Sequence, residues 1–308
     1  MRNCAFPGGY ESGSATRWTL SLDPPPGSRY LSWRDNCIRI TRFRLREGPL
    51  SGQVLGIVPA RLASTRLPNK PLYPLLGRPL IEWVWWRIEG MSVLDHAVVA
   101  TDSEEVAEVC TRLGAPVLMT SSEHPSGTDR VAEVADRPEF ADYEYIANVQ
   151  GDEPLLKENH LRLAIDLVRQ AGWDVGTCAT PLMVDAARND ASVVKVARAA
   201  NGRALYFSRA GIPYKRDEKP LPEELAREPF LRQIGIYAYT RDALHDWVAM
   251  APSQLEKLEL LEQLRPLEAG LRIGVAVVGA ADPGVDTPAD VIRMEEQLRR
   301  QMGATTMA

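Results

Sequence analysis

The sequence lacks long hydrophobic runs and clustered metal ligands. It contains no apolar stretch of about 18 residues and no charged-then-apolar leader ending in small residues, so it predicts neither a membrane span nor secretion. Its four cysteines, Cys4, Cys37, Cys110 and Cys178, lie far apart, without a CxxC pair or grouped histidines. This spacing fits neither a zinc site nor a disulfide scaffold. We therefore expect the protein to reside in a reducing cytoplasm.

An excess of positive charge and the two common phosphate-loop motifs are also missing. With 36 Lys and Arg against 41 Asp and Glu, the formal net charge is -5, which argues against non-specific nucleic-acid binding. Neither GxGxxG after a first strand nor GxxxxGK followed by Ser or Thr occurs. The composition that is present, 45% apolar and 25% charged residues, is typical of a globular protein. Any phosphate group must therefore be bound by another kind of loop.

Residues 1–52 differ from the rest of the chain. They are rich in Gly, Pro, Ser and Arg and show no sustained helical or strand period. We expect this segment to be disordered or loosely docked outside a single folded domain at 53–308. An alternative is that it is upstream sequence included by a wrongly assigned start codon, with synthesis beginning near Val54.

From Val54 onward, short β-rich runs alternate with helical patterns. Strand patterns occur at 54–58, 96–101, 117–120, 145–150, 233–239 and 273–278. Helical patterns occur at 79–90, 104–114, 128–136, 158–170 and 255–269, with a last helix opening at 287–288. The alternation predicts an α/β fold with a doubly wound, mostly parallel sheet. Two further strands around Asn201-Gly202 predict a small antiparallel insertion joined by a type I′ turn.

The stretch 57-IVPARLASTRLPNKPL-72 places three cations directly after the first predicted strand. Arg61, Arg66 and Lys70 emerge there, with the hydroxyl of Ser64 between them. In open α/β sheets ligands bind beyond the carboxyl ends of the strands. Guanidinium forks and an ammonium at that edge suit a polyphosphate. The alternative interpretation is a solvated basic loop, because surface loops often carry a few charges.

Two carboxylates follow two other predicted strands. Asp152 lies in 148-NVQGDEPLL-156, where Gly151 permits a tight turn, and Asp286 lies in 284-GVDTP-288. Hard oxygen ligands beside phosphates indicate magnesium. Each residue has a structural alternative, since Asp152 could cap a turn and Asp286 could cap the last helix. Together they could bracket one Mg²⁺ that bridges phosphoryl oxygens and an incoming nucleophile.

An ordered set of motifs resembles one enzyme family. The set comprises PARLASTRLPNKPL, ATDSEEVAEV, HPSGTDRVAEV, NVQGDEPLL, ALYFSRAGIPY, GIYAYTRDAL, LELLEQLRPLEAG and GVDTPAD. In this order it resembles the 3-deoxy-manno-octulosonate cytidylyltransferases, the CMP-Kdo synthetases of bacterial lipopolysaccharide synthesis, over nearly all of residues 54–300. The resemblance implies a nucleotide-diphospho-sugar transferase-like fold, a cytoplasmic Mg²⁺-dependent homodimer, and no nucleic-acid or membrane partner. The reaction implied is attack of the anomeric hydroxyl of Kdo on the α-phosphorus of CTP, giving CMP-Kdo and pyrophosphate.

The resemblance also assigns roles by motif position. The residues implied to hold the triphosphate are Arg61, Ser64, Arg66 and Lys70. Those implied to line or adjoin the cytidine pocket are Ser126, Gly127, Thr128, Thr101 and Asp102. The Mg²⁺ ligands would be Asp152 and Asp286, which with the three loop cations form the implied catalytic set. The residues implied to bind the sugar are Gln150, Arg209, Gln233, Tyr237, Glu262 and Gln263.

One position departs from the family pattern. Family members commonly have His before the Gly-Ile-Tyr stretch, as in RHLGIY, whereas this chain has Gln233 in RQIGIY. Glutamine can donate a hydrogen bond to a sugar hydroxyl but does not titrate near neutral pH. The acceptor could therefore be 8-amino-Kdo or another acidic sugar such as sialic acid. A further alternative is a non-catalytic nucleotide-binding protein. Without the resemblance, Tyr237 is a half-buried strand residue and Glu262 an exposed helix residue.

Overall fold

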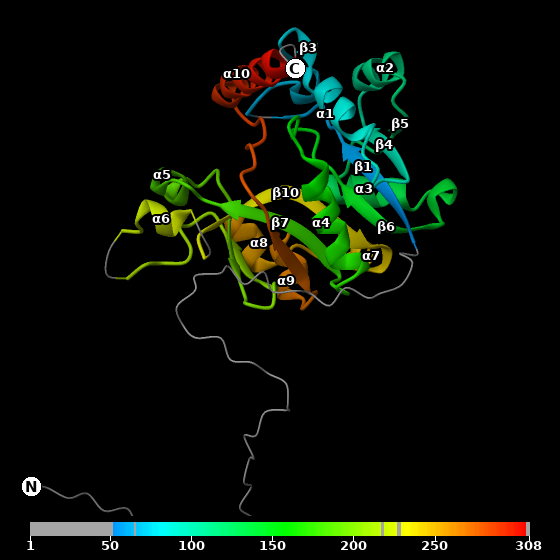
Figure 1. The fold of residues 1–308 in the computed structure, drawn as a ribbon. Coiled ribbons are helices and arrows are strands. Elements are labelled where there is room, and N and C mark those ends of the chain that lie inside the picture. Colours follow the sequence, from blue (N-terminus) through cyan, green and yellow to red (C-terminus); the bar gives the residue numbers. More distant parts are fainter. Residues whose placement is uncertain (1–51, 65, 217–218, 227–228, 306–308) are drawn as a thin grey trace, which may run out of the picture. The chain divides into compact units, whose positions relative to one another are not determined.

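The computed structural model describes residues 52–64, 66–216, 219–226 and 229–305, with side chains up to residue 302. The predicted extension 1–52, apart from Gly52, lies outside the described residues. The described part of the domain is a central, mostly parallel sheet with helices on both faces (Figure 1). The predicted α/β fold class is therefore confirmed.

The central sheet has the strand order β11-β7-β10-β6-β1-β4-β5. These strands span β11 Ile273–Val277, β7 Val175–Pro181, β10 Leu231–Thr240, β6 Tyr143–Asn148, β1 Gln53–Pro59, β4 His96–Thr101 and β5 Val117–Met119. Strand β10 runs antiparallel to β6 and β7, and the other neighbours on this path are parallel. The chain moves from β1 outward to β4 and β5 and then returns to β6 on the other side of β1. A topological switch point, where ligands bind in such sheets, therefore lies between β1 and β6.

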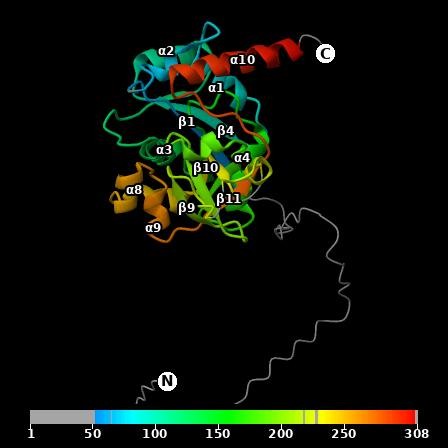
Figure 2. The same ribbon diagram turned by 90° about the vertical axis from the view of Figure 1, so that its left-hand side faces the viewer.

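Helices cover the two faces of the sheet as separate layers (Figure 2). One layer contains α1 Leu80–Ile88, α2 Glu104–Arg112, α4 Glu158–Arg169 and α10 Pro288–Thr305. The other contains α3 Gly127–Ala135, α7 Arg241–Ala249 and α9 Leu264–Glu268. Strand β1 serves both layers, since Val54 and Val58 belong to the first core and Leu55 and Ile57 to the second. This alternation is the period of two that places successive side chains on opposite faces of a strand.

The remaining elements are short. They are the single-turn helices η1 Lys70–Leu72 and η2 Pro138–Phe140, the β2 Pro74–Leu75 and β3 Arg78–Pro79 pair, α5 Asp185–Asn189, α6 Pro222–Leu225 and α8 Gln254–Glu259. Within the described chain, Cys110 and Cys178 are buried free thiols, whose pKa values burial raises to about 11 and about 12. No helix among the described residues is both long enough and apolar enough to cross a bilayer.

The antiparallel insertion is present, but its turn differs from the prediction. Strands β8 Lys195–Arg198 and β9 Ala204–Ser208 pair antiparallel, and β8 also pairs with β10. The type I′ turn is wrong, because it needs positive φ at both central residues and only Gly202 has it, at 93°. The connection is longer: the amide of Gly202 donates to the carbonyl of Ala199, and that of Ala199 to Arg203.

The helix predicted at 255–269 is interrupted. Helix α8 ends at Glu259, Leu260 takes a left-handed conformation with φ 51°, and α9 begins at Leu264. Pro266 gives the physical reason, because it has no N–H to donate to residue 262 and its ring would clash with that carbonyl in a continuous helix. The interruption turns the segment 260–263 toward the site described below.

Helix α4 packs closely against strand β7 in the first layer. A Cβ added at Gly176 of β7 would lie only 2.1 Å from the carbonyl oxygen of Ala164 in α4 and 3.1 Å from Cβ of Leu167. Only glycine lets the helix approach the strand this closely. By contrast, a Cβ added at Gly90, just after α1, would meet nothing within 4 Å.

We expect Gly176→Ala to lower the free energy of unfolding by about 1–3 kcal/mol or more, because backbone atoms must move apart. Urea unfolding monitored by circular dichroism measures this change. Gly90→Ala is the matched control and should leave the midpoint nearly unchanged. Equal midpoints for both variants would contradict the packing described here.

Candidate active site

A cavity of about 880 Å³ lies beyond the carboxyl ends of β1, β6 and β11. Its size is within the range of pockets that bind small ligands, which is about 300–1,000 Å³. Many of the residues predicted from the sequence line it together. They are Arg66, Gly127, Thr128, Gln150, Asp152, Gln233, Tyr237, Glu262, Gln263 and Asp286. The cavity therefore gathers both predicted metal residues, five of the six predicted sugar residues and three of the nine predicted nucleotide residues.

Lys70 joins the two predicted metal carboxylates. Its Nζ lies 2.5 Å from Oδ2 of Asp152 and 2.7 Å from Oδ1 of Asp286. Arg66 Nη2 lies 3.2 Å from the same oxygen of Asp286. Burial alone would lower the pKa of Lys70, but the charges of Asp152 and Asp286 and their hydrogen bonds outweigh it and raise that pKa. The ammonium therefore stays charged at the point where the two carboxylates converge.

Two glycines let the segments bearing these carboxylates come together. A Cβ at Gly151 would lie 2.9 Å from the carbonyl oxygen of Pro59, and one at Gly284 would lie 3.1 Å from that of Asp152. The amide of Val285 donates to the carbonyl of Asp152 over 3.0 Å. The end of β1, the turn after β6 and the segment after β11 are therefore in direct contact.

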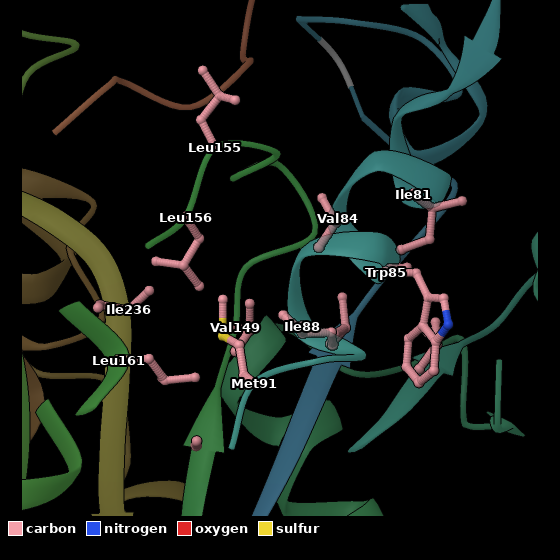
Figure 3. Packing of buried hydrophobic residues seen from close by; sticks show 14 of the residues in the cluster. Ile81, Val84, Trp85, Ile88, Met91, Val149, Leu155, Leu156, Leu161 and Ile236 are labelled. Carbon is pink, nitrogen blue, oxygen red and sulfur yellow. The ribbon is translucent and has the colours of Figure 1, made fainter. Parts of the chain in front are cut away.

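Apolar contacts anchor the turn that carries Asp152. Leu155 and Leu156 follow it and are buried in the same core as Ile88 of α1 and Ile236 of β10 (Figure 3). Figure 3 shows these side chains together with Val149, the residue that leads out of β6. The carboxylate thus projects from a turn fixed on both sides by the core.

Thr101 and Asp102 hold the start of the basic loop and do not line the cavity. Thr101 Oγ1 donates to the carbonyl of Ala60 over 2.7 Å. Asp102 accepts from the amide of Leu62 over 3.3 Å and pairs with buried Arg130 at 2.8 Å. Both side chains therefore hold the backbone of the basic loop in place without lining the cavity.

Three more predicted residues lie outside the cavity lining. Ser126 caps α3, accepting from the amide of Asp129 over 3.2 Å. Arg61 is exposed and Ser64 is half-buried in the basic loop. Their expected nucleotide contacts stay predictions.

Amide, hydroxyl and carboxyl groups that hydrogen-bond to one another form the other end of the cavity. Gln263 Nε2 donates to Gln233 Oε1 over 2.8 Å, and Gln233 Nε2 donates to the hydroxyl of Tyr237. Glu262 accepts from Thr128 Oγ1 over 3.0 Å, and burial raises the pKa of its carboxyl. Burial also raises the pKa of Tyr237 well above its usual value, so that the phenol remains protonated. This end can recognise hydroxyl groups.

Arg209 is the predicted sugar residue that the structure places elsewhere. It does not line the cavity. Its guanidinium donates instead to the backbone carbonyls of Ala191, Glu259 and Leu260 over 2.7–3.1 Å. A sugar contact by Arg209 therefore stays an untested expectation.

Glu153 and Arg232 are among the cavity residues that were not predicted from the sequence. Glu153 follows Asp152 in the same turn, and burial together with the charge of Asp152 raises its pKa to about 8. Arg232 precedes Gln233 on β10, and burial lowers its pKa against the opposing effect of Glu153. The only sequence feature that could have pointed to either residue is its position next to a predicted site residue. No motif distinguishes these two side chains from structural ones.

Asp152 and Asp286 form a donor set that fits magnesium. The described residues contain no group of three or more His, Cys, Asp or Glu that could hold a metal. Mg²⁺ does not need such a group, since it binds through one or two carboxylates plus substrate phosphates and water. Two carboxylates that already converge on one cation, the ammonium of Lys70, match that requirement.

Comparison with known proteins identifies the family. Residues 55–273 match the family model described as cytidylyltransferase. The 3-deoxy-manno-octulosonate cytidylyltransferase of Gemmatimonas aurantiaca is 49% identical over 78% of this chain and 92% of that protein. The protein of the same name from Pseudomonas fluorescens is 43% identical over 79% of this chain and 96% of its own length.

Solved structures agree with this family. One is CMP:2-keto-3-deoxy-manno-octonic acid synthetase complexed with CTP, with a TM-score of 0.73 and 34% identity over 81% of this chain and 99% of that chain. A cytidylyltransferase structure from Leptospira borgpetersenii has a TM-score of 0.51 at 16% identity, over 80% of this chain and 86% of that one, and shows the fold alone. The resemblance inferred from the motifs is thereby confirmed. The chain belongs to the cytidylyltransferase family and is a nucleotidyltransferase homologous to the 3-deoxy-manno-octulosonate cytidylyltransferases.

Proposed function

We propose that the protein transfers CMP from CTP to the anomeric hydroxyl of Kdo, giving CMP-Kdo and pyrophosphate for lipopolysaccharide synthesis. The observation that carries the proposal is the division of the single cavity into two chemically different ends. One end gathers Arg66 and the Lys70–Asp152–Asp286 cluster. The other presents amides, a phenol and a carboxyl. The charged end suits a triphosphate with its metal, and the other end suits a polyhydroxylated acid.

The basic loop is proposed to hold the triphosphate. Arg66 lines the cavity, and the Lys70 ammonium adjoins it through the two aspartates. Arg61 and Ser64 belong to the same loop and are proposed to complete phosphate binding. Guanidinium forks and an ammonium neutralise phosphate charge through charge-assisted hydrogen bonds. Thr101 and Asp102 fix the backbone of this loop. The loop cations therefore need little rearrangement when the nucleotide binds.

Asp152 and Asp286 are proposed to hold Mg²⁺. When bound, the ion would neutralise charge on the phosphoryl oxygens and make the α-phosphorus more open to attack. Lys70 pairs with both carboxylates, and its ammonium can also donate hydrogen bonds to phosphate oxygens. The chain's own residues therefore position and neutralise the reacting groups, which is most of what phosphoryl transfer requires.

The cytidine and sugar subsites are proposed to adjoin at α3. Ser126, Gly127 and Thr128 start that helix, and backbone groups there can read a pyrimidine edge, with Thr101 and Asp102 supporting the neighbouring loop. Thr128 also donates to Glu262, which links the two subsites. The residues proposed for the sugar subsite are Gln150, Gln233, Tyr237, Glu262 and Gln263.

Gln233 favours a second candidate acceptor, 8-amino-Kdo. The side-chain amide is engaged by Gln263 and Tyr237 and carries no charge at any working pH. A protonated side chain at this position would repel an ammonium group on the sugar, whereas a glutamine does not. We further propose, as the family resemblance implies, that the enzyme is a homodimer of the cytoplasm.

Pyrophosphate release from CTP and Mg²⁺ tests the proposed function. We expect release only when an acidic sugar is added, with Kdo and 8-amino-Kdo assayed separately beside a sugar-free control. Mass spectrometry of the CMP-sugar product identifies the acceptor. Release with 8-amino-Kdo but not with Kdo would show that the amino sugar is the substrate. No release with either sugar would contradict the proposal.

Asp286→Asn is expected to lower kcat by about 10²–10³ while leaving the unfolding midpoint nearly unchanged. A neutral amide is a poor Mg²⁺ ligand, and losses of this size are typical when one electrostatic contributor to a transition state is removed. Binding of Mn²⁺ in the presence of CTP, measured by electron paramagnetic resonance, should weaken in parallel.

Asp282→Asn is the matched control. Asp282 lies in the same segment and accepts a hydrogen bond from Gln297 over 2.7 Å, but it does not line the cavity. Activity and Mn²⁺ binding of this control should stay within about twofold of wild type, since changes away from functional contacts have small effects. Full activity of Asp286→Asn would contradict a metal-binding role and leave Asp286 only as a partner of Lys70 and Arg66.

A further inference from the structure

Two walls of the cavity come from segments far apart in the sequence. The hairpin wall, residues 190–194, precedes β8 and contributes Asp190, Ser192, Val193 and Val194. The helix-break wall, residues 260–263, lies between α8 and α9 and contributes Leu260, Leu261, Glu262 and Gln263. Neither wall is regular secondary structure, although the amide of Gln233 in β10 donates to the carbonyl of Val194 over 2.9 Å. Contacts from residues outside the two walls join them to each other.

Arg209 forms such a contact with both walls. Its Nη1 donates to the carbonyl of Ala191 in the hairpin wall over 2.9 Å. Its Nη2 donates to the carbonyl of Leu260 in the helix-break wall over 3.1 Å, and Nε donates to the adjoining carbonyl of Glu259 over 2.7 Å. One rigid planar guanidinium therefore spans the two walls.

The carboxylate of Glu259 strengthens the same junction. It accepts from the backbone amide of Arg209 over 2.8 Å and from the hydroxyl of Ser208 over 2.6 Å. The end of β9 is thus bound to the end of α8 through both backbone and side chain. This junction leaves the guanidinium little freedom to turn toward the cavity.

Buried Lys195 closes the hairpin wall onto Arg209. Its Nζ donates to the carbonyls of Asp190 over 2.8 Å, Val193 over 2.6 Å and Arg209 over 2.5 Å. All three ammonium donors are therefore used by backbone oxygens. Lys195 fixes the turn that the hairpin wall makes, and Arg209 fixes the distance from this turn to the opposite wall.

We propose that Arg209, supported by Lys195, is a positioning residue that sets the width of the sugar end of the cavity without contacting the sugar. The proposal rests on the proposed function for the identity of the ligand. The helix-break wall carries Glu262 and Gln263, and Gln263 orients Gln233 over 2.8 Å. A shift of this wall therefore moves Glu262 and Gln263 and, through Gln263, the side-chain amide of Gln233. Arginines that do line the cavity, and so can meet a substrate carboxylate directly, include Arg232 and Arg293.

Kinetics with a charged and an uncharged acceptor separate positioning from direct contact. The variants are Arg209→Met and Arg209→Lys, assayed with the acidic sugar and with its methyl ester. Arg198→Met is the matched control, because Arg198 lies on the same hairpin and also donates to a backbone carbonyl over 2.8 Å, but this carbonyl belongs to Val275 in β11 and to neither wall.

We expect Arg209→Met to reduce kcat/KM for the sugar about 10- to 100-fold, mainly through KM, because misplacement of about 1 Å can have effects of this size. The KM for CTP should change less than about twofold, as should the ratio of kcat/KM for the acid to that for the ester. Arg209→Lys should fall between wild type and Arg209→Met, since lysine keeps the charge but not the planar fork. A collapse of the acid-to-ester ratio would show direct contact and overturn the proposal.

Hydrogen exchange of the free enzyme gives a readout that does not depend on the sugar. In Arg209→Met and Arg209→Lys, amides in both walls should exchange faster than in wild type, whereas the basic loop 60–70 should not change. Unchanged exchange in either wall would overturn the proposal. If wild type turns over neither sugar, the proposed function fails and the exchange result still decides whether Arg209 holds the walls.

Discussion

The ion cluster formed by Lys70, Asp152 and Asp286 is the interaction on which the site depends. Its members follow three different strands, and each brings its own segment to the switch point of the sheet. Two carboxylates this close together repel each other, and the ammonium between them offsets this repulsion. The packing supports this arrangement, because Gly151 and Gly284 allow backbone contact and Leu155 and Leu156 anchor the turn in the core. Under the proposed function, this cluster would place a divalent cation and a polyphosphate at one edge of the cavity.

The two ends of the cavity divide the chemical work. The charged end depends on a few ionic contacts whose partners can change when the nucleotide enters. The sugar end depends on fixed neutral groups, in which Gln263, Gln233 and Tyr237 are joined by hydrogen bonds. Such a set discriminates by shape and by hydrogen-bond direction, because a buried polar group left without a partner is unfavourable. Arg209 and Lys195 hold the backbone of this end without lining the cavity. Thr101 and Asp102 hold the backbone of the basic loop in a similar way.

Sequence periodicity and strand-end chemistry predicted much of the fold and the site. The alternation around Val54–Val58 gave the buried first strand, and strand ends in a parallel sheet meet at one edge, so Arg66, Lys70, Asp152 and Asp286 could be placed together. Strand β7 was not predicted, because Gly176, Thr177 and Cys178 interrupt the continuous apolar run expected of a buried strand. The helix break at Leu260 was also missed, although Pro266 signalled it. The contacts of Arg209 could not be predicted, since they depend on how two distant irregular segments meet in space.

The central claim is that the Lys70 ammonium occupies the position where the two carboxylates would bind a divalent cation. Binding of Mn²⁺ to the nucleotide-free enzyme, measured by electron paramagnetic resonance for wild type, Lys70→Met and Lys157→Met, tests it most directly. Lys157 donates to the carbonyl of Ala280 and serves as a control for the change in net charge. We predict that Lys70→Met binds Mn²⁺ about tenfold more tightly than wild type, because a competing cation has been removed, and that Lys157→Met does not. Unchanged or weaker binding by Lys70→Met would contradict the claim.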